Sequence, residues 1–121
     1  MAHILFIDDD PYTLETLSRA AQVIGHEAYV AGSGEEGIRI AAERTPDLIF
    51  TDLNLSDMDG LSLIEHLKEM PASAQIPIFI LSASPVEDIV NRAQAAGAKA
   101  YLNKPVRLQT LMEIIRDNVP K

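Results

Sequence analysis

The stretch Asp-Leu-Ile-Phe-Thr-Asp at residues 47–52 shows how this chain folds. Its apolar centre is continuous and it ends in Asp52, as expected for a short strand that is covered on both faces. Four more apolar runs lie at regular spacing, and segments with helical periodicity separate them. Together the five runs are Ile4–Ile7, Ala28–Ala31, Leu48–Phe50, Ile76–Leu81 and Ala100–Leu102. This alternation predicts an α/β fold, in which a five-stranded parallel sheet carries helices on both faces.

Capping and turn residues place a helix after each run. Asp10-Pro11 has the pattern of an N-cap followed by proline at the first helical position. Residues 33–36, Ser-Gly-Glu-Glu, fit a capping box, in which a serine and a glutamate bond to each other's backbone N–H groups. The other helix signals are a second capping box at Ser84-Pro85-Val86-Glu87, Gly60 at a helix start, Gly25 and Gly97 at helix ends, and Leu108, Leu111, Met112 and Ile115 along the last helix.

The composition limits the architecture and the partners. The 121 residues suffice for one domain, which we expect to span residues 1–121. Cysteine is absent, which excludes a disulfide and agrees with a cytoplasmic location. A formal net charge of -8 disfavours direct binding of nucleic acid or of an anionic membrane by this domain. We recognise no signal peptide and no transmembrane run, so no membrane association is expected.

Charged and polar side chains follow the ends of four of the five runs. Asp8 and Asp9 follow the first run, Asp52 the third, Ser82 the fourth and Lys104 the fifth. Because the carboxyl ends of parallel strands meet at one edge of a sheet, we expect these side chains to share a pocket. Like charges so close repel one another unless a cation neutralises them, and hard carboxylate oxygens suit Mg²⁺. A carboxylate beside Mg²⁺ and a lysine is suited to accept a phosphoryl group.

These motifs resemble the receiver domain of two-component response regulators, of the chemotaxis-regulator type. The resemblance covers essentially the whole chain, and it is specific because the motifs occur in order, each at a predicted strand end. It implies a doubly wound, flavodoxin-like sheet of five strands in the order 2-1-3-4-5, flanked by five helices. The matching pieces are Ile7-Asp8-Asp9-Asp10, Asp52-Leu53-Asn54 with Met58-Asp59-Gly60, Leu81-Ser82-Ala83 and Tyr101-Leu102-Asn103-Lys104-Pro105.

The resemblance implies a role for each acidic residue of the pocket. Asp52 matches the phosphoryl acceptor. Asp8 and Asp9 match the acidic pair that binds Mg²⁺, together with Asp52 and the backbone carbonyl of Asn54. Adjacent strand residues point to opposite faces, so Asp8 and Asp9 reach one metal only because the strand is ending, and we expect one of them to bind through water. Asp10 is better explained as a helix cap than as a ligand.

Three further residues match positions that respond to the phosphoryl group. Ser82 matches the switch hydroxyl, which donates a hydrogen bond to a phosphoryl oxygen. Lys104 matches the lysine that pairs with Asp52 at rest and with the phosphoryl group afterwards, and in the family its peptide bond to Pro105 is commonly cis. Tyr101 matches the aromatic switch, whose ring packs inward or stands in solvent. By this resemblance Asp52, Lys104 and Ser82 carry the chemistry, and Ser82 and Tyr101 form the switch.

A phosphorylation-dependent signalling switch in a two-component system or phosphorelay follows from these roles. The resemblance implies a histidine kinase or a histidine phosphotransfer protein as the phosphodonor, because His3, His26 and His66 are best explained as structural or solvent-facing residues. It implies that a downstream protein or a fused output domain reads the face formed by the fourth helix, the fifth strand and the fifth helix. Such a domain is not an enzyme, apart from promoting its own phosphoryl transfer and dephosphorylation.

Two alternatives remain open. An aspartyl-nucleophile phosphohydrolase carries an Asp-x-Asp pair after its first strand, and Asp8 and Asp10 have that spacing. Against it, Tyr12 stands where Thr or Val is usual and the chain is short for a substrate cap. A degenerate receiver that only docks partners is the second alternative, and the intact acceptor, acids, serine and lysine argue against it.

The chain departs from the family after Asp52. Many members have Met-Pro where this chain has Leu55-Ser56, and the loss of proline predicts a looser loop. Val106 stands where Phe is common after Lys-Pro. The residues just before Tyr101 lack the acidic pair of the winged-helix transcription factors, which weakens the case for that subfamily's charged dimer.

Overall fold

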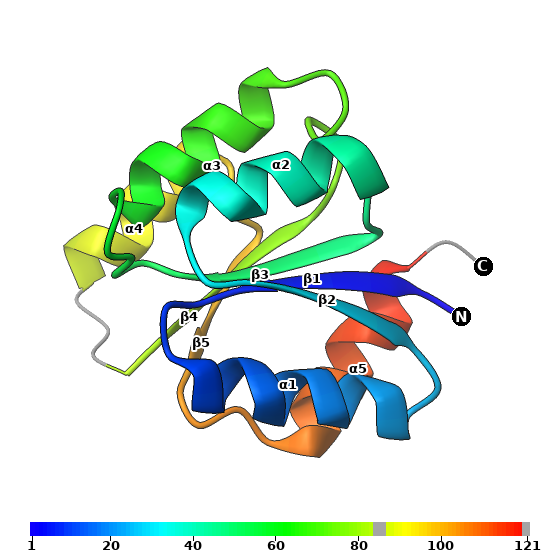
Figure 1. Ribbon diagram of the computed structural model, residues 1–121. Coiled ribbons are helices and arrows are strands. Elements are labelled where there is room, and N and C mark those ends of the chain that lie inside the picture. Colours follow the sequence, from blue (N-terminus) through cyan, green and yellow to red (C-terminus); the bar gives the residue numbers. More distant parts are fainter. Residues whose placement is uncertain (84–86, 120–121) are drawn as a thin grey trace.

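The computed structural model describes residues 1–83 and 87–119, and it confirms the predicted α/β fold. The elements are β1 (His3–Ile7), α1 (Pro11–Val23), β2 (Glu27–Ala31), α2 (Gly34–Arg44), β3 (Leu48–Asp52), α3 (Gly60–Glu69), β4 (Ile78–Ser82), α4 (Glu87–Ala96), β5 (Ala100–Asn103) and α5 (Leu108–Asn118). All strands are parallel, in the predicted order β2-β1-β3-β4-β5. Helices α2, α3 and α4 cover one face of the sheet, and α1 and α5 cover the other (Figure 1).

The pairing of the strands brings their carboxyl ends level at one edge of the sheet. In β1, Ile7 lies opposite Ala31 of β2 and Thr51 of β3. On the other side of β3, Asp52 lies opposite Leu81 of β4. The residue after β1 and the last residue of β3 therefore lie side by side. This edge is on the left in Figure 1, whereas β1 begins and α5 ends at the opposite edge.

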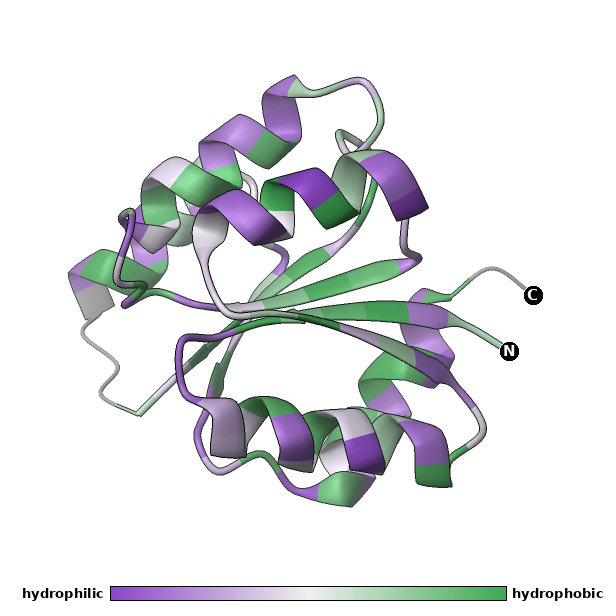
Figure 2. Cartoon of the chain, in the orientation of Figure 1, coloured by the Kyte–Doolittle hydropathy of each residue, from purple (hydrophilic) through white to green (hydrophobic). Residues whose placement is uncertain are grey.

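Two apolar cores hold the layers together. On the side of α1 and α5, Phe6, Phe50 and Phe79 from three adjacent strands stack with ring centroids 5.4 Å apart at each step. The other core is mainly aliphatic and includes fully buried leucine and isoleucine side chains of α3. Strands β3 and β4 are buried along their whole length, which explains their continuous apolar sequence. Figure 2 shows these apolar strands between helices of mixed polarity.

The helix starts agree with the predicted caps, with one displaced bond. Asp10 caps α1 by accepting from Tyr12 N, and proline is the first helical residue. At α2, Ser33 Oγ accepts from Glu36 N at 3.1 Å, as predicted. The Glu36 carboxylate, however, accepts from Gly32 N at 3.3 Å, one residue before the donor that a capping box uses. The second predicted capping box, at Ser84, Pro85 and Val86, lies outside the described residues.

The predicted start of the fourth strand differs from the structure in detail. Strand β4 begins after Pro77, so the proline precedes the strand instead of lying within it. In α5 only two of the four apolar positions are buried, because the helix presents a narrow stripe to the sheet; Leu111 and Ile115 are buried, and Leu108 and Met112 are 45% and 44% exposed. Within the part of the chain that the structure describes, no helix has the length and apolar character to cross a membrane.

Candidate functional site

The acidic residues predicted for the pocket lie together at the carboxyl ends of β1 and β3. Asp52 is the last residue of β3, and Asp8 follows the last residue of β1. Asp8 and Asp52 are buried, and Asp9, one residue further along, is exposed. Carboxylate oxygens of the three residues lie within 4.8 Å of one another. Parallel pairing thus brings together the three acids predicted as metal ligands.

The ammonium of Lys104 lies between the two buried carboxylates. It donates to Asp8 Oδ2 at 2.5 Å and to Asp52 Oδ2 at 2.9 Å. Burial by itself lowers the pKa of Lys104, but its hydrogen bonds to Asp8 and Asp52 and the negative charge of both outweigh burial and hold this pKa above its ordinary value. The predicted pair with Asp52 is therefore present, and the bond to Asp8 is an addition. The Lys104–Pro105 peptide is cis, as the resemblance implied.

The second oxygen of each buried carboxylate accepts from the backbone. Asp8 Oδ1 accepts from Asp10 N at 2.9 Å, and Asp52 Oδ1 accepts from Asn54 N at 3.2 Å. The Asp10 carboxylate bonds elsewhere, to Tyr12 N at 3.1 Å and to the hydroxyl of the following threonine at 2.9 Å. Asp10 therefore caps α1, as predicted, and orients Asp8 only through its backbone.

Ser82, the last residue of β4, and Tyr101, the second residue of β5, are the predicted switch residues and contact each other. Ser82 is buried as the last residue of β4. Its carbonyl accepts from Tyr101 Oη at 3.1 Å and from Lys104 N at 3.0 Å. The Tyr101 ring is half-buried and packs against the aliphatic core. One backbone carbonyl thus connects the tyrosine to the lysine that holds both acids.

The β3–α3 loop, residues 53–59, contains Asn54 and is closed at its base. Asn54 and Asp59 form an antiparallel bridge, and Gly60 N donates to Leu53 O at 3.0 Å. Position 60 has no room for a side chain, since a Cβ there would lie 2.5 Å from Leu53 Cα. Asn54 is exposed, two residues after Asp52 and at the same edge of the sheet. The loop base is therefore held to the carboxyl end of β3.

A contact at the tip of this loop was missed by the sequence reasoning. The Asp57 carboxylate accepts from Gly34 N at 2.8 Å and from Glu35 N at 2.9 Å, at the start of α2. Backbone hydrogen bonds, first from Glu35 and then from Gly34, lower the pKa of Asp57. The loop lacks the family's proline, but this contact attaches it to a second element. No local pattern reveals the contact, because its partners lie more than twenty residues earlier in the chain.

The histidines lie apart from the acidic group. His26 Nδ1 accepts from Ala2 N at 2.9 Å, and His3 Nδ1 lies 3.0 Å from Tyr29 Oη, both at the opposite edge of the sheet. His66 is exposed on α3. In residues 1–83 and 87–119, the three aspartates form the one group of acidic or histidine side chains close enough to share a metal ion.

The donors of this group fit a hard divalent cation. All three side chains offer carboxylate oxygens, which Mg²⁺ prefers, and one of them is exposed and accessible to hydrated ions. Two of the three carboxylates, those of Asp8 and Asp52, pair with the ammonium of Lys104, so three negative charges face one positive charge and negative charge remains in excess. The chemistry of the residues present therefore agrees with an Mg²⁺ site.

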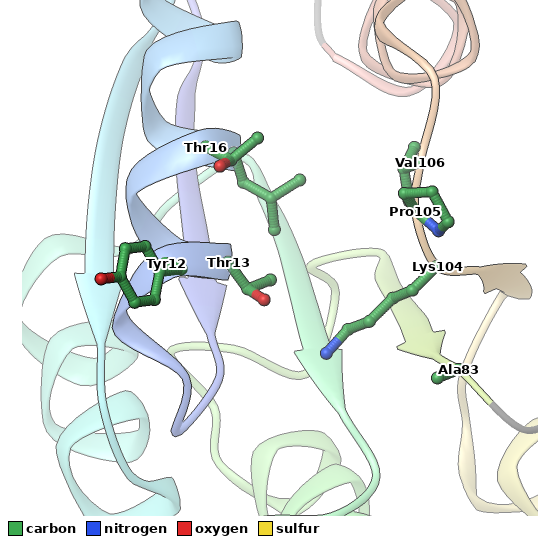
Figure 3. A pocket seen from close by; sticks show the side chains of 8 residues that line it. Tyr12, Thr13, Thr16, Ala83, Lys104, Pro105 and Val106 are labelled. Atoms are coloured by element: carbon green, nitrogen blue, oxygen red, sulfur yellow. The ribbon is translucent and has the colours of Figure 1, made fainter.

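A cleft of about 430 Å³ adjoins the acidic group on the side of α1. It runs between the first turns of α1 and the β5–α5 connection, and Lys104 reaches past it toward the strand ends (Figure 3). Tyr12 is one of the residues that line it and is 80% exposed. This cleft therefore borders the acidic group through Lys104, which lines it.

Known proteins share both the sequence and the fold. Residues 4–116 match the response regulator receiver domain family. The gliding motility regulatory protein of Myxococcus xanthus is 39% identical over 101 residues, which are 84% of this chain and 13% of that protein. The transcriptional regulatory protein PrrA of Mycobacterium tuberculosis is 37% identical over 93% of this chain and 48% of its own length. The chain therefore spans less than half the length of these two relatives.

Other similar proteins have nearly the same length as this chain. Protein PilH of Pseudomonas aeruginosa is 29% identical, and the match covers 95% of each protein. The crystal structure of the chemotaxis protein CheY4 of Vibrio cholerae aligns with a TM-score of 0.92 and 25% identity, over 98% of this chain and 99% of that one. Since the family match extends over residues 4–116 and the fold agrees with it, this chain belongs to the receiver domains of two-component response regulators.

Proposed function

We propose that residues 1–121 form one receiver domain whose Asp52 carboxylate takes a phosphoryl group from a phosphohistidine of a histidine kinase or a histidine phosphotransfer protein. Membership of the family supports the general role in phosphorylation-dependent signalling. The observation that carries the choice of acceptor is accessibility: the Asp52 side chain is 12% exposed and the Asp8 side chain 3%, although both bond to Lys104. A phosphodonor that approaches from solvent reaches Asp52 before Asp8, and Asp52, unlike the exposed Asp9, is paired with the Lys104 ammonium.

The transfer breaks the P–N bond of the phosphohistidine and forms a P–O bond to one oxygen of Asp52. The electron pair of the broken bond goes to the histidine ring nitrogen, and the ring, protonated on its other nitrogen, leaves as neutral imidazole. The product on Asp52 is an acyl phosphate, so a phosphoryl group with about two negative charges replaces the single charge of the carboxylate. Lys104, which lies 2.9 Å from Asp52 Oδ2, stabilises this charge, and its raised pKa keeps it an ammonium at neutral pH. The bond from Lys104 to Asp8 holds the ammonium in place while its other partner changes.

Asp8, Asp9, Asp52 and the backbone carbonyl of Asn54 are the residues that we assign to a Mg²⁺ ion. Receiver domains generally bind Mg²⁺ at an acidic pocket, and the cluster of three carboxylates supports such a pocket here. When bound, the ion neutralises charge that develops on the phosphoryl oxygens. Without it, the excess of carboxylates repels an anionic phosphodonor.

Ser82 and Tyr101 are the residues that we assign to signal output. The Ser82 hydroxyl donates to the phosphoryl group, and the bond between Ser82 O and Tyr101 Oη supports a coupled movement of β4 and β5. The face of α4, β5 and α5 then changes shape for a downstream protein or a fused output domain. Exposed Leu108 and Met112 on α5 give this face apolar surface. The cytoplasmic location stays a prediction.

The phosphohydrolase alternative is less well supported. Its second aspartate would be Asp10, but the carboxylate of Asp10 is engaged in capping α1. A degenerate receiver is disfavoured because Asp8, Asp52 and Lys104 form a complete ion-pair cluster. Both alternatives predict that acetyl phosphate leaves no lasting label on Asp52.

The identity of the acceptor is tested with acetyl phosphate and Mg²⁺, with the modified residue mapped by mass spectrometry. We expect one phosphoryl group on Asp52 in the wild type and none at this site in Asp52→Asn. Asp47→Asn is the control, because Asp47 lies at the opposite edge of the sheet and accepts from His3 N. Normal labelling of Asp52→Asn would contradict the assignment.

The role of Ser82 is tested with a beryllofluoride mimic of the phosphoryl group. Ser82→Ala should still take a phosphoryl group on Asp52, but amide chemical shifts over residues 87–111 should change much less than in the wild type. Ser73→Ala is the control, since it removes a buried hydroxyl that donates to Leu67 O, far from the pocket. Equal shift changes in Ser82→Ala and the wild type would show that the signal takes another route.

A further inference from the structure

The β3–α3 loop joins two parts of the molecule. At its base, Asn54 lies next to Asp52 and its backbone N donates to that carboxylate at 3.2 Å. At its tip, the Asp57 carboxylate bonds to the start of α2. A short stretch of backbone separates the two attachments, so a displacement of the tip moves the base.

The attachment of the tip is closely fitted. Asp57 uses both carboxylate oxygens, one for Gly34 N at 2.8 Å and one for Glu35 N at 2.9 Å. The next side chain, Met58, lies over Gly34, where a Cβ would stand 2.5 Å from Met58 Cγ. Two charge-assisted hydrogen bonds and the packing of Met58 on Gly34 therefore hold the tip against the start of α2.

The base of the loop is closed by contacts between its own two ends and with Asp52. It has the bond from Gly60 N to Leu53 O and the bridge between Asn54 and Asp59, and the segment between has no proline to stiffen it. The carbonyl that we assign to the metal belongs to Asn54, within this segment. A backbone ligand cannot adjust by changing rotamer, so its position depends on how the loop is held.

We propose that Asp57 is a positioning residue for the metal site: by clamping the β3–α3 loop to the start of α2, it holds the Asn54 carbonyl where the ion needs it. The inference rests on the proposed function, since it takes the Asn54 carbonyl as a metal ligand. In this protein the clamp takes over the role of the missing proline. The start of α2 and the metal site are then mechanically coupled, and either one affects the other.

The test measures Mg²⁺ affinity and folding stability separately. Asp57→Ala should weaken Mg²⁺ binding by roughly three- to tenfold, as measured by titration calorimetry. This loss is smaller than is usual for a residue that bonds directly to a metal ligand, because the effect of Asp57 passes through the backbone of the loop. Asp57→Asn, which keeps one acceptor oxygen but loses the charge, should fall between Asp57→Ala and the wild type. Chemical unfolding shows what each variant does to stability.

Two matched controls separate the clamp from simpler effects. Ser33→Ala removes another cap from the same end of α2, the bond from Glu36 N, but leaves the loop attached. It should lower stability and leave Mg²⁺ affinity unchanged. Glu35→Gln removes one negative charge beside Asp57 but keeps the backbone N–H that the clamp uses. Its Mg²⁺ affinity should change much less than that of Asp57→Asn.

A further readout needs no metal. In metal-free protein, hydrogen exchange of the Gly60 amide should speed up in Asp57→Ala and not in Ser33→Ala. Wild-type Mg²⁺ affinity in a folded Asp57→Ala, or equal losses in the two alanine variants, would overturn the proposal. Failure of the wild type itself to bind Mg²⁺ would instead refute the proposed function, and the exchange rates would still decide whether the clamp exists.

Discussion

The two edges of the sheet use the same kinds of polar side chain in different ways. At the amino ends of the strands, Asp47 accepts from His3 N at 2.8 Å and His26 accepts from Ala2 N at 2.9 Å, so each side chain has its own backbone donor. At the carboxyl ends, three carboxylates lie within 4.8 Å of one another, and two of them share the ammonium of Lys104.

This difference separates aspartates that stabilise the fold from the group to which we assign phosphoryl transfer. A carboxylate with a backbone donor and no neighbouring charge stabilises a turn or a strand start. Carboxylates that share too few cations repel one another, and a bound metal ion can relieve this repulsion. The same substitution should therefore have opposite effects at the two edges.

The largest effect is expected from Lys104→Met, which leaves Asp8 and Asp52 without a cation. Loss of one partner from a buried ion pair is strongly destabilising, and because this pocket is open on one side we expect the free energy of unfolding at pH 7 to fall by about 2–4 kcal/mol without Mg²⁺. Added Mg²⁺ should restore part of it. Lys99→Met is the control, because the exposed Lys99 ammonium bonds to the neutral side chain of Asn118. Equal losses in both variants would contradict the comparison.

The pH dependence of this effect has a defined sign. The folded pKa of Lys104 is raised, so its contribution is fully present below the ordinary lysine value of 10.5 and is lost as the pH rises through the folded value. The difference in unfolding free energy between wild type and Lys104→Met should therefore be constant around neutral pH and shrink at alkaline pH. Urea unfolding at a series of pH values measures it.

A smaller effect, with a change of sign between the edges, is expected from removing one aspartate. Without metal, Asp9→Ala should raise the free energy of unfolding by roughly 0.5–1 kcal/mol, because it relieves repulsion among the three carboxylates. Asp47→Ala should lower it by about 0.5–1.5 kcal/mol, because His3 N loses its acceptor. Asp9→Ala should also weaken Mg²⁺ binding markedly. Destabilisation of metal-free protein by both substitutions would refute the repulsion argument.

The smallest effect concerns His26 at the amino-end edge. Burial, and then the positive charge of the chain's amino group, lower the pKa of His26 below 6.5. The contribution of His26 to stability is therefore present above pH 6.5. It is lost as the pH falls through the pKa of His26 in the folded protein, because the unfolded chain binds the proton more tightly. In His26→Gln the decline of stability from pH 7.5 to 5 should be shallower than in the wild type. His66→Gln, at an exposed position on α3, should follow the wild type.

Much of the acidic site was predictable because strand ends are local features of the sequence. Asp52 ends a continuous apolar run, Asp8 follows another, and parallel pairing must bring such positions to one edge. The capping role of Asp10 was equally visible, since an N-cap depends only on the next few residues. Contacts between distant residues were not visible in this way: neither the bond from Lys104 to Asp8 nor the one from Asp57 to α2 has a sequence signal.

By itself, the sequence determined the α/β class, the positions of the strands and the group of residues that meet at their carboxyl ends. It could do so because the alternation of apolar runs and helix caps depends on residues that are neighbours in the chain. Tertiary structure decided the rest. It decided that Lys104 bonds to Asp8, 96 residues earlier in the chain, as well as to Asp52. It also decided that Leu108 and Met112 face outward on α5, and that Asp57 holds the loop after Asp52. The physical reason is that these contacts depend on how the helices pack on the sheet, and packing is set by the shapes of all the layers together.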